Sequence, residues 1–477
     1  MEEFDVVIVG AGISGINTAY RVQTELPSSR YVILDAREDI GGTWSFFRYP
    51  GIRSDSDLYS FGFAWKPWTA GKAIAAAPLI MNYLREAVSE TGIDQHIRFK
   101  HRVSAADWSI KEQCWQISVT DTDGSPIQFK SKFIVLGTGY YDYEKGLSAS
   151  IPGIDNFGGP VVHPQFWPED FDYSDKNIVL IGSGATAVTL LPNLAKKAAY
   201  VTMLQRSPTY IVKVDNKKSS SWGILPQHLS LQLTRLFHIT IGILFYNFCR
   251  LFPSRARNLL QSGVAKQLPT TVPMDPHFTP TYRPWDQRVC FTPDGDFFEA
   301  IKEGKANVAT GTIREVVEDG VILQSGEKLD ADALVTATGL KIQAMGGICI
   351  SVDGEKIDIG EKYAWNNAMI QDIPNFFFVV GYINASWTLG ADATAKLFCR
   401  LVKYMQRQGY QSAVAGGVDA KTIGYRPLLG LTSTYVTRGG SELPKCGNSG
   451  PWLPRTNYFF DLYKAVMGNI TTGLAFS

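Results

Sequence analysis

Short apolar runs recur along this chain, and two of them have the same continuation. Residues 4–9 (FDVVIV) and 177–181 (NIVLI) are each followed by a glycine-rich turn and then by a helix-like stretch. Apolar runs of this length, bounded by turn residues, are typical of buried strands. The pattern therefore predicts two strand–turn–helix units, one at the N-terminal end and one in the middle of the chain.

The two turns have the spacing of dinucleotide-binding fingerprints. They read GAGISG over 10–15 and GSGATA over 182–187. The first glycine permits a tight turn, the second lets the backbone approach a pyrophosphate, and the third position must be small for helix and strand to pack. The pyrophosphate then lies at the positive end of a helix dipole. Two such sites predict two redox dinucleotides on one protein.

The strands that follow the turns differ at their ends. The run over 31–35 ends in Asp35, twenty residues after Gly15, where a carboxylate can accept hydrogen bonds from an adenosine ribose. The run over 200–205 ends in Gln205, and Arg206 comes next. An acid there would repel a 2′-phosphate, whereas an arginine can pair with it. We therefore expect FAD at the first site and NADPH at the second.

The remaining pattern predicts an α/β fold with two Rossmann-like dinucleotide-binding domains and a helical insertion. Further strands are expected over 103–119, 133–139, 333–339 and 376–382, and an amphipathic helix over 391–406. The long apolar stretch over 212–281 carries several prolines and is predicted to be helical and to close over the active site. The predicted parts are an FAD-binding domain (1–145 and 336–477), an NADP-binding domain (146–211 and 282–335) and the insertion (212–281).

Composition excludes several classes of protein. The chain has 477 residues and a formal net charge of +1, which gives no indication of nucleic-acid binding. Its six cysteines are far apart and form no CxxC pair, so neither a dithiol redox centre nor a metal site is expected. The N-terminal residues lack the basic region of a signal peptide, and we expect a cytoplasmic protein.

One segment leaves the question of membrane contact open. Residues 237–252 (FHITIGILFYNFCRLF) are strongly apolar and precede Arg255 and Arg257. The run is shorter than the roughly 20 residues that a membrane span needs. A buried helix pair is the favoured interpretation, and a helix lying on a membrane surface, giving peripheral association, is the alternative.

A third motif lies between the two turns. Residues 157–170 read FGGPVVHPQFWPED and fit F-x-G-x-x-x-H-x-x-x-W-P through Phe157, Gly159, His163, Trp167 and Pro168. This motif resembles the signature of type I Baeyer–Villiger monooxygenases. Stretches over 39–61, 181–192, 202–212, 284–290 and 381–389 are similar to the ethionamide-activating branch of the flavin-containing monooxygenase superfamily, known from mycobacteria.

The resemblance implies roles for particular residues. FAD would be held by Gly10, Gly12, Ser14, Gly15, Asp35, Thr43, Trp44, Asp55 and Val103. NADP would be held by Arg53, Ser54, Gly182, Ser183, Gly184, Ala185, Thr186, Ala187, Arg206 and Ser207. His163 would position the linker between the domains, and the catalytic pair would be Arg288 and Asp55.

The implied activity is an NADPH- and O2-dependent oxidation of ketones to esters or lactones through a C4a-peroxyflavin. An arginine suits this chemistry because it stays protonated and can stabilise a peroxide anion and the adduct that follows. Oxidation of sulfides or thioamides is a second expected activity. The alternatives are a flavin-containing monooxygenase acting on nitrogen and sulfur only, an NADPH-dependent flavin reductase, and a nucleotide-binding scaffold without turnover.

Overall fold

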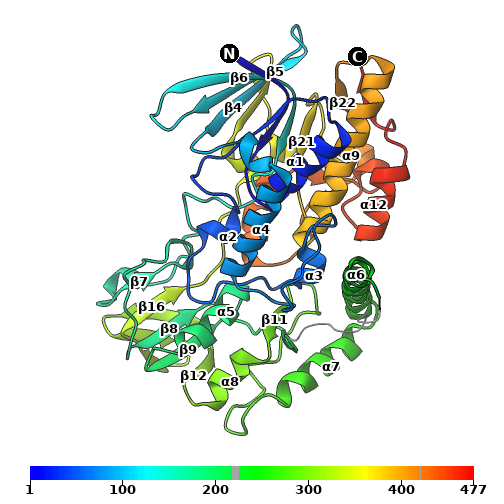
Figure 1. The fold of residues 1–477 in the computed structure, drawn as a ribbon. Coiled ribbons are helices and arrows are strands. Elements are labelled where there is room, and N and C mark those ends of the chain that lie inside the picture. The colour runs from blue at the N-terminus through cyan, green and yellow to red at the C-terminus, as the bar shows by residue number, and fades with distance from the viewer. Residues whose placement is uncertain (217–224, 419) are drawn as a thin grey trace.

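Two sheets, each containing one of the glycine-rich turns, lie at opposite ends of the molecule (Figure 1). The computed structural model describes residues 1–216, 225–418 and 420–477. The chain leaves the first sheet after β6 (Pro126–Leu136) and returns to it at β17 (Cys349–Val352), so the second sheet is built from the segment between them.

The first sheet is centred on β1 (Glu2–Val9), which pairs in parallel with β2 (Tyr31–Leu34) and β6. An antiparallel layer formed by β4 (Arg102–Ser109) and β5 (Cys114–Thr120) extends it beyond β6. Its remaining strands are β3 (Ile97–Arg98), β17, β18 (Glu355–Lys356), β19 (Ala364–Trp365), β20 (Met369–Ile370) and β21 (Phe376–Phe378).

The second sheet is entirely parallel and has the order β12-β9-β8-β16-β7. Its strands are β7 (Val161–Val162), β8 (Asn177–Ile181), β9 (Tyr200–Gln205), β12 (Ala306–Thr310) and β16 (Ala333–Thr336). Parallel strands need crossover connections, and the turn after β8 leads into one of these helices, α5 (Ala185–Leu194). The α/β fold with two dinucleotide-binding sheets, predicted from the sequence, is confirmed.

Helices cover the first sheet on the side of the first turn. Helix α1 (Ile13–Glu25) packs against α9 (Trp387–Gln408), and α12 (Tyr458–Met467) packs on α9 from outside (Figure 1). The helices α2 (Thr43–Phe46), α3 (Leu58–Phe61) and α4 (Ala77–Thr91) follow β2. The apolar side chains of β1 divide between two clusters, so the sheet has a core on each face.

The insertion differs from its prediction. Its first residues belong to a strand, β10 (Ile211–Val214), which pairs in parallel with β11 (Cys290–Pro293). Residues 217–224 lie outside the described residues. The segment 237–252 is not a buried helix pair: it belongs largely to one 25-residue helix, α6 (Gln227–Leu251), followed by α7 (Pro253–Ala265). Among the described residues, only α6 is long and apolar enough to cross a membrane.

Other predicted elements differ mainly at their ends. The β-rich stretch over 103–119 is the hairpin of β4 and β5, as predicted. The run over 376–382 forms a strand only as far as Phe378, whereas the helix expected over 391–406 begins earlier, at Trp387. The small sheets contain β13 (Ile313–Val317), β14 (Gly320–Leu323), β15 (Lys328–Asp330), β22 (Ala413–Ala415), β23 (Arg426–Pro427), β24 (Lys445–Cys446) and β25 (Leu474–Phe476). The short helices are α8 (Asp296–Lys302), α10 (Ala420–Ile423) and α11 (Thr434–Gly439). The domain boundaries stay a prediction.

Candidate active site

The first glycine turn is closed tightly against its neighbours. Gly10 has φ +101°, and a Cβ atom there would lie 2.7 Å from the carbonyl oxygen of Gly137. A Cβ atom on Gly15 would lie 1.8 Å from the carbonyl oxygen of Gly10. No side chain caps α1, so its first N–H groups are free to bind an anion. The backbone of this turn therefore fits a pyrophosphate.

Asp35 is held in place at the end of β2. Its carboxylate accepts hydrogen bonds from the backbone N–H of Ala11 (2.7 Å) and of Arg37 (2.8 Å). The residue is buried, and it lines the same cavity as Gly10. An oriented carboxylate at this position can bind ribose hydroxyls.

One cavity of about 670 Å³ joins the first turn to the second. It is lined by more than half of the residues predicted to act in the site. These are Gly10, Gly12, Ser14, Asp35, Thr43, Trp44, Arg53, Ser54, Asp55, Val103, Ala185, Thr186 and Arg288. Segments far apart in the chain therefore meet around one space, as a two-cofactor site requires.

Arg288 and Asp55 meet at the edge of this cavity. The Arg288 Nη2 atom lies 3.5 Å from Asp55 Oδ1, although 233 residues separate them in the chain. The Asp55 carboxylate raises the pKa of Arg288 above its already high value, so the guanidinium is a permanent cation. Its Nε atom is buried without a partner, which leaves a donor unsatisfied beside the cavity.

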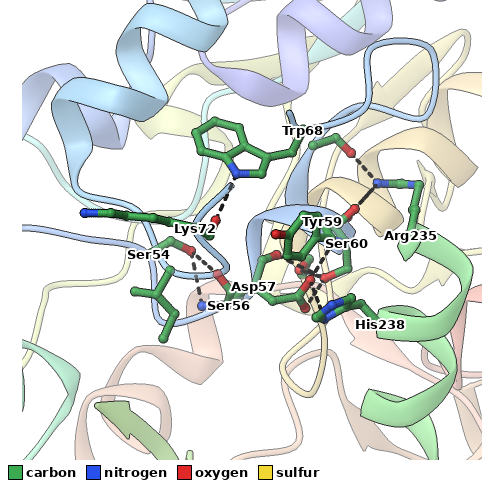
Figure 2. A network of polar contacts seen from close by, with 12 residues as sticks. Ser54, Ser56, Asp57, Tyr59, Ser60, Trp68, Lys72, Arg235 and His238 are labelled. Carbon is green, nitrogen blue, oxygen red and sulfur yellow. Dashed lines mark hydrogen bonds and ion pairs between the residues drawn. The ribbon is translucent and has the colours of Figure 1, made fainter. Parts of the chain in front are cut away.

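The residues before Asp55 are engaged by neighbouring groups. Arg53 forms a bidentate pair with Asp296, in which Nη2 lies 3.2 Å from Oδ1. The hydroxyl of Ser54 donates to the carbonyl of Ser56 (2.8 Å) and closes a local turn, drawn in Figure 2. Arg53 and Ser54 both line the cavity. Their side chains are already bonded to other groups of the protein, so they shape the cavity wall.

The second glycine turn is more open than the first. Gly182 has φ +134°, and a Cβ atom there would lie 2.2 Å from the carbonyl oxygen of Ala337. A Cβ atom on Gly184 would meet nothing within 4 Å. The Ser183 hydroxyl donates to the carbonyl of Ser207 (3.1 Å), which ties the turn to the end of β9.

Arg206 stands exposed at that end of β9. Its Nη2 atom lies 3.4 Å from the hydroxyl of Thr434. Gln205, at the last position of the strand, is buried and donates to the carbonyl of His277 (2.7 Å). The cation, and not the amide, is therefore the group accessible to a phosphate.

Several predicted residues do not line the cavity. They are Gly15, Gly182, Ser183, Gly184, Ala187, Arg206, Ser207, Phe157, Gly159, His163 and Trp167. The linker residues among them pack instead: the His163 Nδ1 atom accepts from the N–H of Gln165 (3.2 Å), and burial lowers the pKa of His163. A neutral, packed histidine suits the positioning role expected of it.

A group of tyrosines was missed by the sequence interpretation. Tyr140 and Tyr141 follow the turn after β6, line the cavity and share a hydrogen bond between their hydroxyls. Burial raises the pKa of Tyr140, and the charge of Arg288 opposes that rise. The hydroxyl of the nearby Tyr143 shares a hydrogen bond with the hydroxyl of Thr43 (3.2 Å). One signal could have found them, because residues at the carboxyl end of a parallel strand often face a ligand.

All six cysteines are described and none forms a disulfide. Within the described ranges, no group of three His, Cys, Asp or Glu side chains could hold a metal ion. The groups around the cavity include the backbone of the first glycine turn, hydroxyls, the carboxylates of Asp35 and Asp55, and the guanidinium groups of Arg53 and Arg288, which fits two dinucleotides.

The chain is similar to several known proteins. A family model described as pyridine nucleotide-disulphide oxidoreductase matches residues 7–229. The FAD-containing monooxygenase EthA of Mycolicibacterium smegmatis is 46% identical over 465 residues, covering 97% of this chain and 94% of the relative.

Solved structures share the fold. The open crystal structure of cyclohexanone monooxygenase matches with a TM-score of 0.77 at 18% identity, covering 100% of both chains. The crystal structure of OTEMO in complex with FAD and NADP matches with a TM-score of 0.74 at 19% identity, covering 99% of both chains.

Proposed function

Since this chain belongs to the family of FAD-containing monooxygenases, we propose that it uses NADPH and O2 to convert ketones to esters or lactones, the Baeyer–Villiger reaction. Oxidation of sulfides or thioamides is the second activity that we propose. The observation that carries the proposal is the Arg288–Asp55 pair, which borders a cavity shared by both glycine turns.

The cofactors are assigned to the two turns by their chemistry. The first turn would hold FAD, because the uncapped N-terminus of α1 suits a pyrophosphate and the Asp35 carboxylate suits a ribose. The second turn would hold NADPH, and Arg206 is the residue that would bind its 2′-phosphate. The reduced flavin supplies the electrons that activate O2, and the protein supplies position and charge.

Arg288 acts on the substrate side of the cavity. When the activated oxygen adds to the carbonyl carbon of a ketone, negative charge grows on the former carbonyl oxygen. A cation fixed beside that atom stabilises this charge without reorganising, which is the largest single term in many enzymes. Asp55 keeps the guanidinium oriented and protonated, because the pair lies only 3.5 Å apart.

The test compares Arg288→Ala with a matched variant, Arg283→Ala, which removes an exposed arginine from the same loop. Loss of one aligned charge should lower ester formation by about 100- to 1000-fold. NADPH oxidation should continue in Arg288→Ala, with release of hydrogen peroxide, and Arg283→Ala should behave as the wild type. Undiminished ester formation by Arg288→Ala would contradict the assignment.

The alternative activities predict different products. An enzyme that acts on heteroatoms only would form a sulfoxide from methyl phenyl sulfide and no ester from a ketone. An NADPH-dependent flavin reductase would put no atom of ¹⁸O2 into any product. Mass spectrometry of one ketone and one sulfide under ¹⁸O2 therefore separates the three activities.

We also propose that residues 237–252 touch a membrane peripherally. The support is that the segment is apolar and lies largely in a helix whose buried residues are few.

A further inference from the structure

Tyr140 and Tyr141 share a hydrogen bond at the wall of the cavity that joins the two glycine turns. Their two hydroxyl groups carry two protons, and the bond between them uses one, whichever oxygen accepts it. The other proton is left for another acceptor. Because both side chains are half-buried and line the cavity, the pair can donate a hydrogen bond to a ligand.

The backbone of this pair is fixed by the segment that follows β16. The carbonyl of Tyr140 accepts a hydrogen bond from the N–H of Gln343 (3.0 Å), and Tyr141 forms an antiparallel bridge with Ile342. Since β6 belongs to the first sheet and β16 to the second, the pair lies where segments from the two sheets meet. Contacts from both sides therefore hold it in one position.

The ring of Tyr140 is fixed as well. It stacks on the ring of Trp387, with ring centroids 5.0 Å apart and an angle of 17° between the planes. The indole N–H of Trp387 donates to the hydroxyl of Ser14, in the first glycine turn (3.0 Å). A hydroxyl held in this way does not need to reorganise when charge develops beside it, which is the condition for stabilising a transition state.

The proton that is left over belongs to Tyr140. Burial is the main cause that raises the pKa of Tyr141 and of Tyr435, and a hydrogen bond with Tyr140 raises both values further. The same two bonds lower the pKa of Tyr140. Since a hydrogen bond makes its donor a weaker acid and its acceptor a stronger one, Tyr141 and Tyr435 donate and Tyr140 accepts. The proton of Tyr140 itself is thus free for the cavity.

Tyr140 is also the hydroxyl of the pair that lies nearer to Arg288. Burial raises the pKa of Tyr140, and the charge of Arg288 opposes that rise more than any other group does. On Tyr141, the charge of Arg288 acts less than Tyr140 and Tyr435 do. Tyr140 therefore stays protonated at neutral pH, and two donors, one neutral and one cationic, lie side by side at the cavity.

We propose that Tyr140 donates a hydrogen bond to the carbonyl oxygen of the ketone, beside Arg288, and that Tyr141 directs this donation. The inference rests on the proposed function, because it takes a ketone carbonyl as the group that binds next to Arg288. An oxygen that gains negative charge accepts more than one hydrogen bond, and sites that stabilise such an oxygen combine several donors. Tyr140 is then a catalytic residue that keeps its proton, and Tyr141 is a positioning residue.

This role favours ketones over sulfides. When the activated oxygen adds to a carbonyl carbon, negative charge grows on the carbonyl oxygen, and a donor aimed at that atom lowers the barrier. A sulfide has no such oxygen, because its sulfur atom gives up electrons to the incoming oxygen. The hydroxyl of Tyr140 should therefore accelerate ester formation and leave sulfoxide formation unaffected.

The first test measures both products with the FAD-loaded enzyme. Tyr140→Phe removes the hydroxyl and keeps the ring against Trp387. We expect its kcat for ester formation to fall about 10- to 100-fold, the effect of one hydrogen bond to a charged group, and its KM for the ketone to change less. Sulfoxide formation from methyl phenyl sulfide should stay unchanged, and Tyr141→Phe should lower ester formation by a smaller factor.

The matched control is Tyr363→Phe. It removes the hydroxyl of a buried tyrosine that donates to the carbonyl of Gly424 (3.0 Å) and does not line the cavity. It should behave as the wild type in both reactions, and flavin absorbance will show that every variant holds its cofactor. Undiminished ester formation by Tyr140→Phe, or an equal loss of ester and sulfoxide, would overturn the inference.

The second test does not depend on turnover. It records the infrared C=O stretch of 2-octanone, labelled with ¹³C at its carbonyl carbon, bound to the oxidised enzyme in saturating NADP⁺. A hydrogen bond to the carbonyl weakens the C=O bond, so the frequency should be higher in Tyr140→Phe than in the wild type, with Tyr141→Phe between them and Tyr363→Phe equal to the wild type.

The infrared result separates the failure of this inference from the failure of the proposed function. Equal C=O frequencies in the wild type and in Tyr140→Phe would overturn the tyrosine contact, whether or not the enzyme forms esters. A higher frequency in Tyr140→Phe, from an enzyme whose wild type forms no ester, would support the carbonyl contact and contradict the proposed reaction.

Discussion

The two glycine turns follow the same rule but are set in different surroundings. In the first, a Cβ atom on Gly12 would lie 3.5 Å from Gly42 Cα, because a second glycine stretch passes over the turn. In the second, Gly184 faces open space. The first turn is enclosed with its buried carboxylate, Asp35, and the second ends at an exposed arginine, Arg206.

This difference suits two cofactors with different residence times. A flavin must stay bound through the catalytic cycle, and an enclosed site keeps its ligand by excluding water from every hydrogen bond. A nicotinamide must enter and leave in each turnover, and an exposed cation on an open turn permits this. If the two turns hold FAD and NADPH as proposed, the same fingerprint would serve two kinetic needs through the residues that surround it.

Among changes to the two turns, the largest effect is expected from a substitution in the first turn. Gly15→Ala would place Cβ 1.8 Å from the carbonyl oxygen of Gly10, so strand and helix must separate where the pyrophosphate binds. Because overpacking costs about 1–3 kcal/mol even where side chains can move, we expect at least about tenfold less FAD in the purified protein. The ratio of flavin to protein absorbance measures it.

The same position in the second turn gives the control. Ala187→Gly removes a methyl group from a buried helix position and should leave the FAD content unchanged. If Gly15→Ala kept its full flavin, the first turn would not be the flavin site.

A smaller effect is expected where the second turn recognises phosphate. Arg206→Ala should raise the KM for NADPH about tenfold and leave the KM for NADH unchanged, because a charge-assisted bond to the 2′-phosphate is lost. Steady-state kinetics with both nucleotides measure this difference. The KM of Arg206→Lys for NADPH should lie between the values of the wild type and of Arg206→Ala. Equal KM changes for both nucleotides would show that Arg206 does not read the phosphate.

The smallest expected effect is on the pH dependence of stability, and it involves two histidines on the side of the second turn. Burial lowers the pKa of both His163 and His277, so each is neutral in the folded protein. Below about pH 6.5 the unfolded chain takes up protons that the folded chain does not bind, and stability falls with decreasing pH.

The double variant His163→Asn/His277→Asn keeps a polar atom near each Nδ1 but cannot be protonated. Between pH 7.5 and 5.5, the Tm of the wild type should fall by about 2 °C more than the Tm of the double variant. Calorimetric scans at the two pH values provide the measurement. An identical loss in both proteins would assign the acid sensitivity to other groups.

Sequence by itself determined the two turns, their strands, and the position of Asp35 and Arg206. These features depend on backbone conformation and strand ends within about thirty residues, so they leave a local pattern. It did not determine the exposure of α6, because an apolar helix reads alike whether protein or lipid covers it. The Arg288–Asp55 pair was suggested by family resemblance, since no local pattern distinguishes that arginine.

Only the tertiary structure decided which distant side chains meet. It joined Arg288 to Asp55 and Arg53 to Asp296, each across more than 200 residues, and it set Tyr140 beside the cavity. It also brought Ile239 of α6 and Tyr458 of α12 into one apolar cluster. The physical reason is that such contacts depend on how two sheets and an insertion pack together, and neither period nor spacing along the chain records that packing.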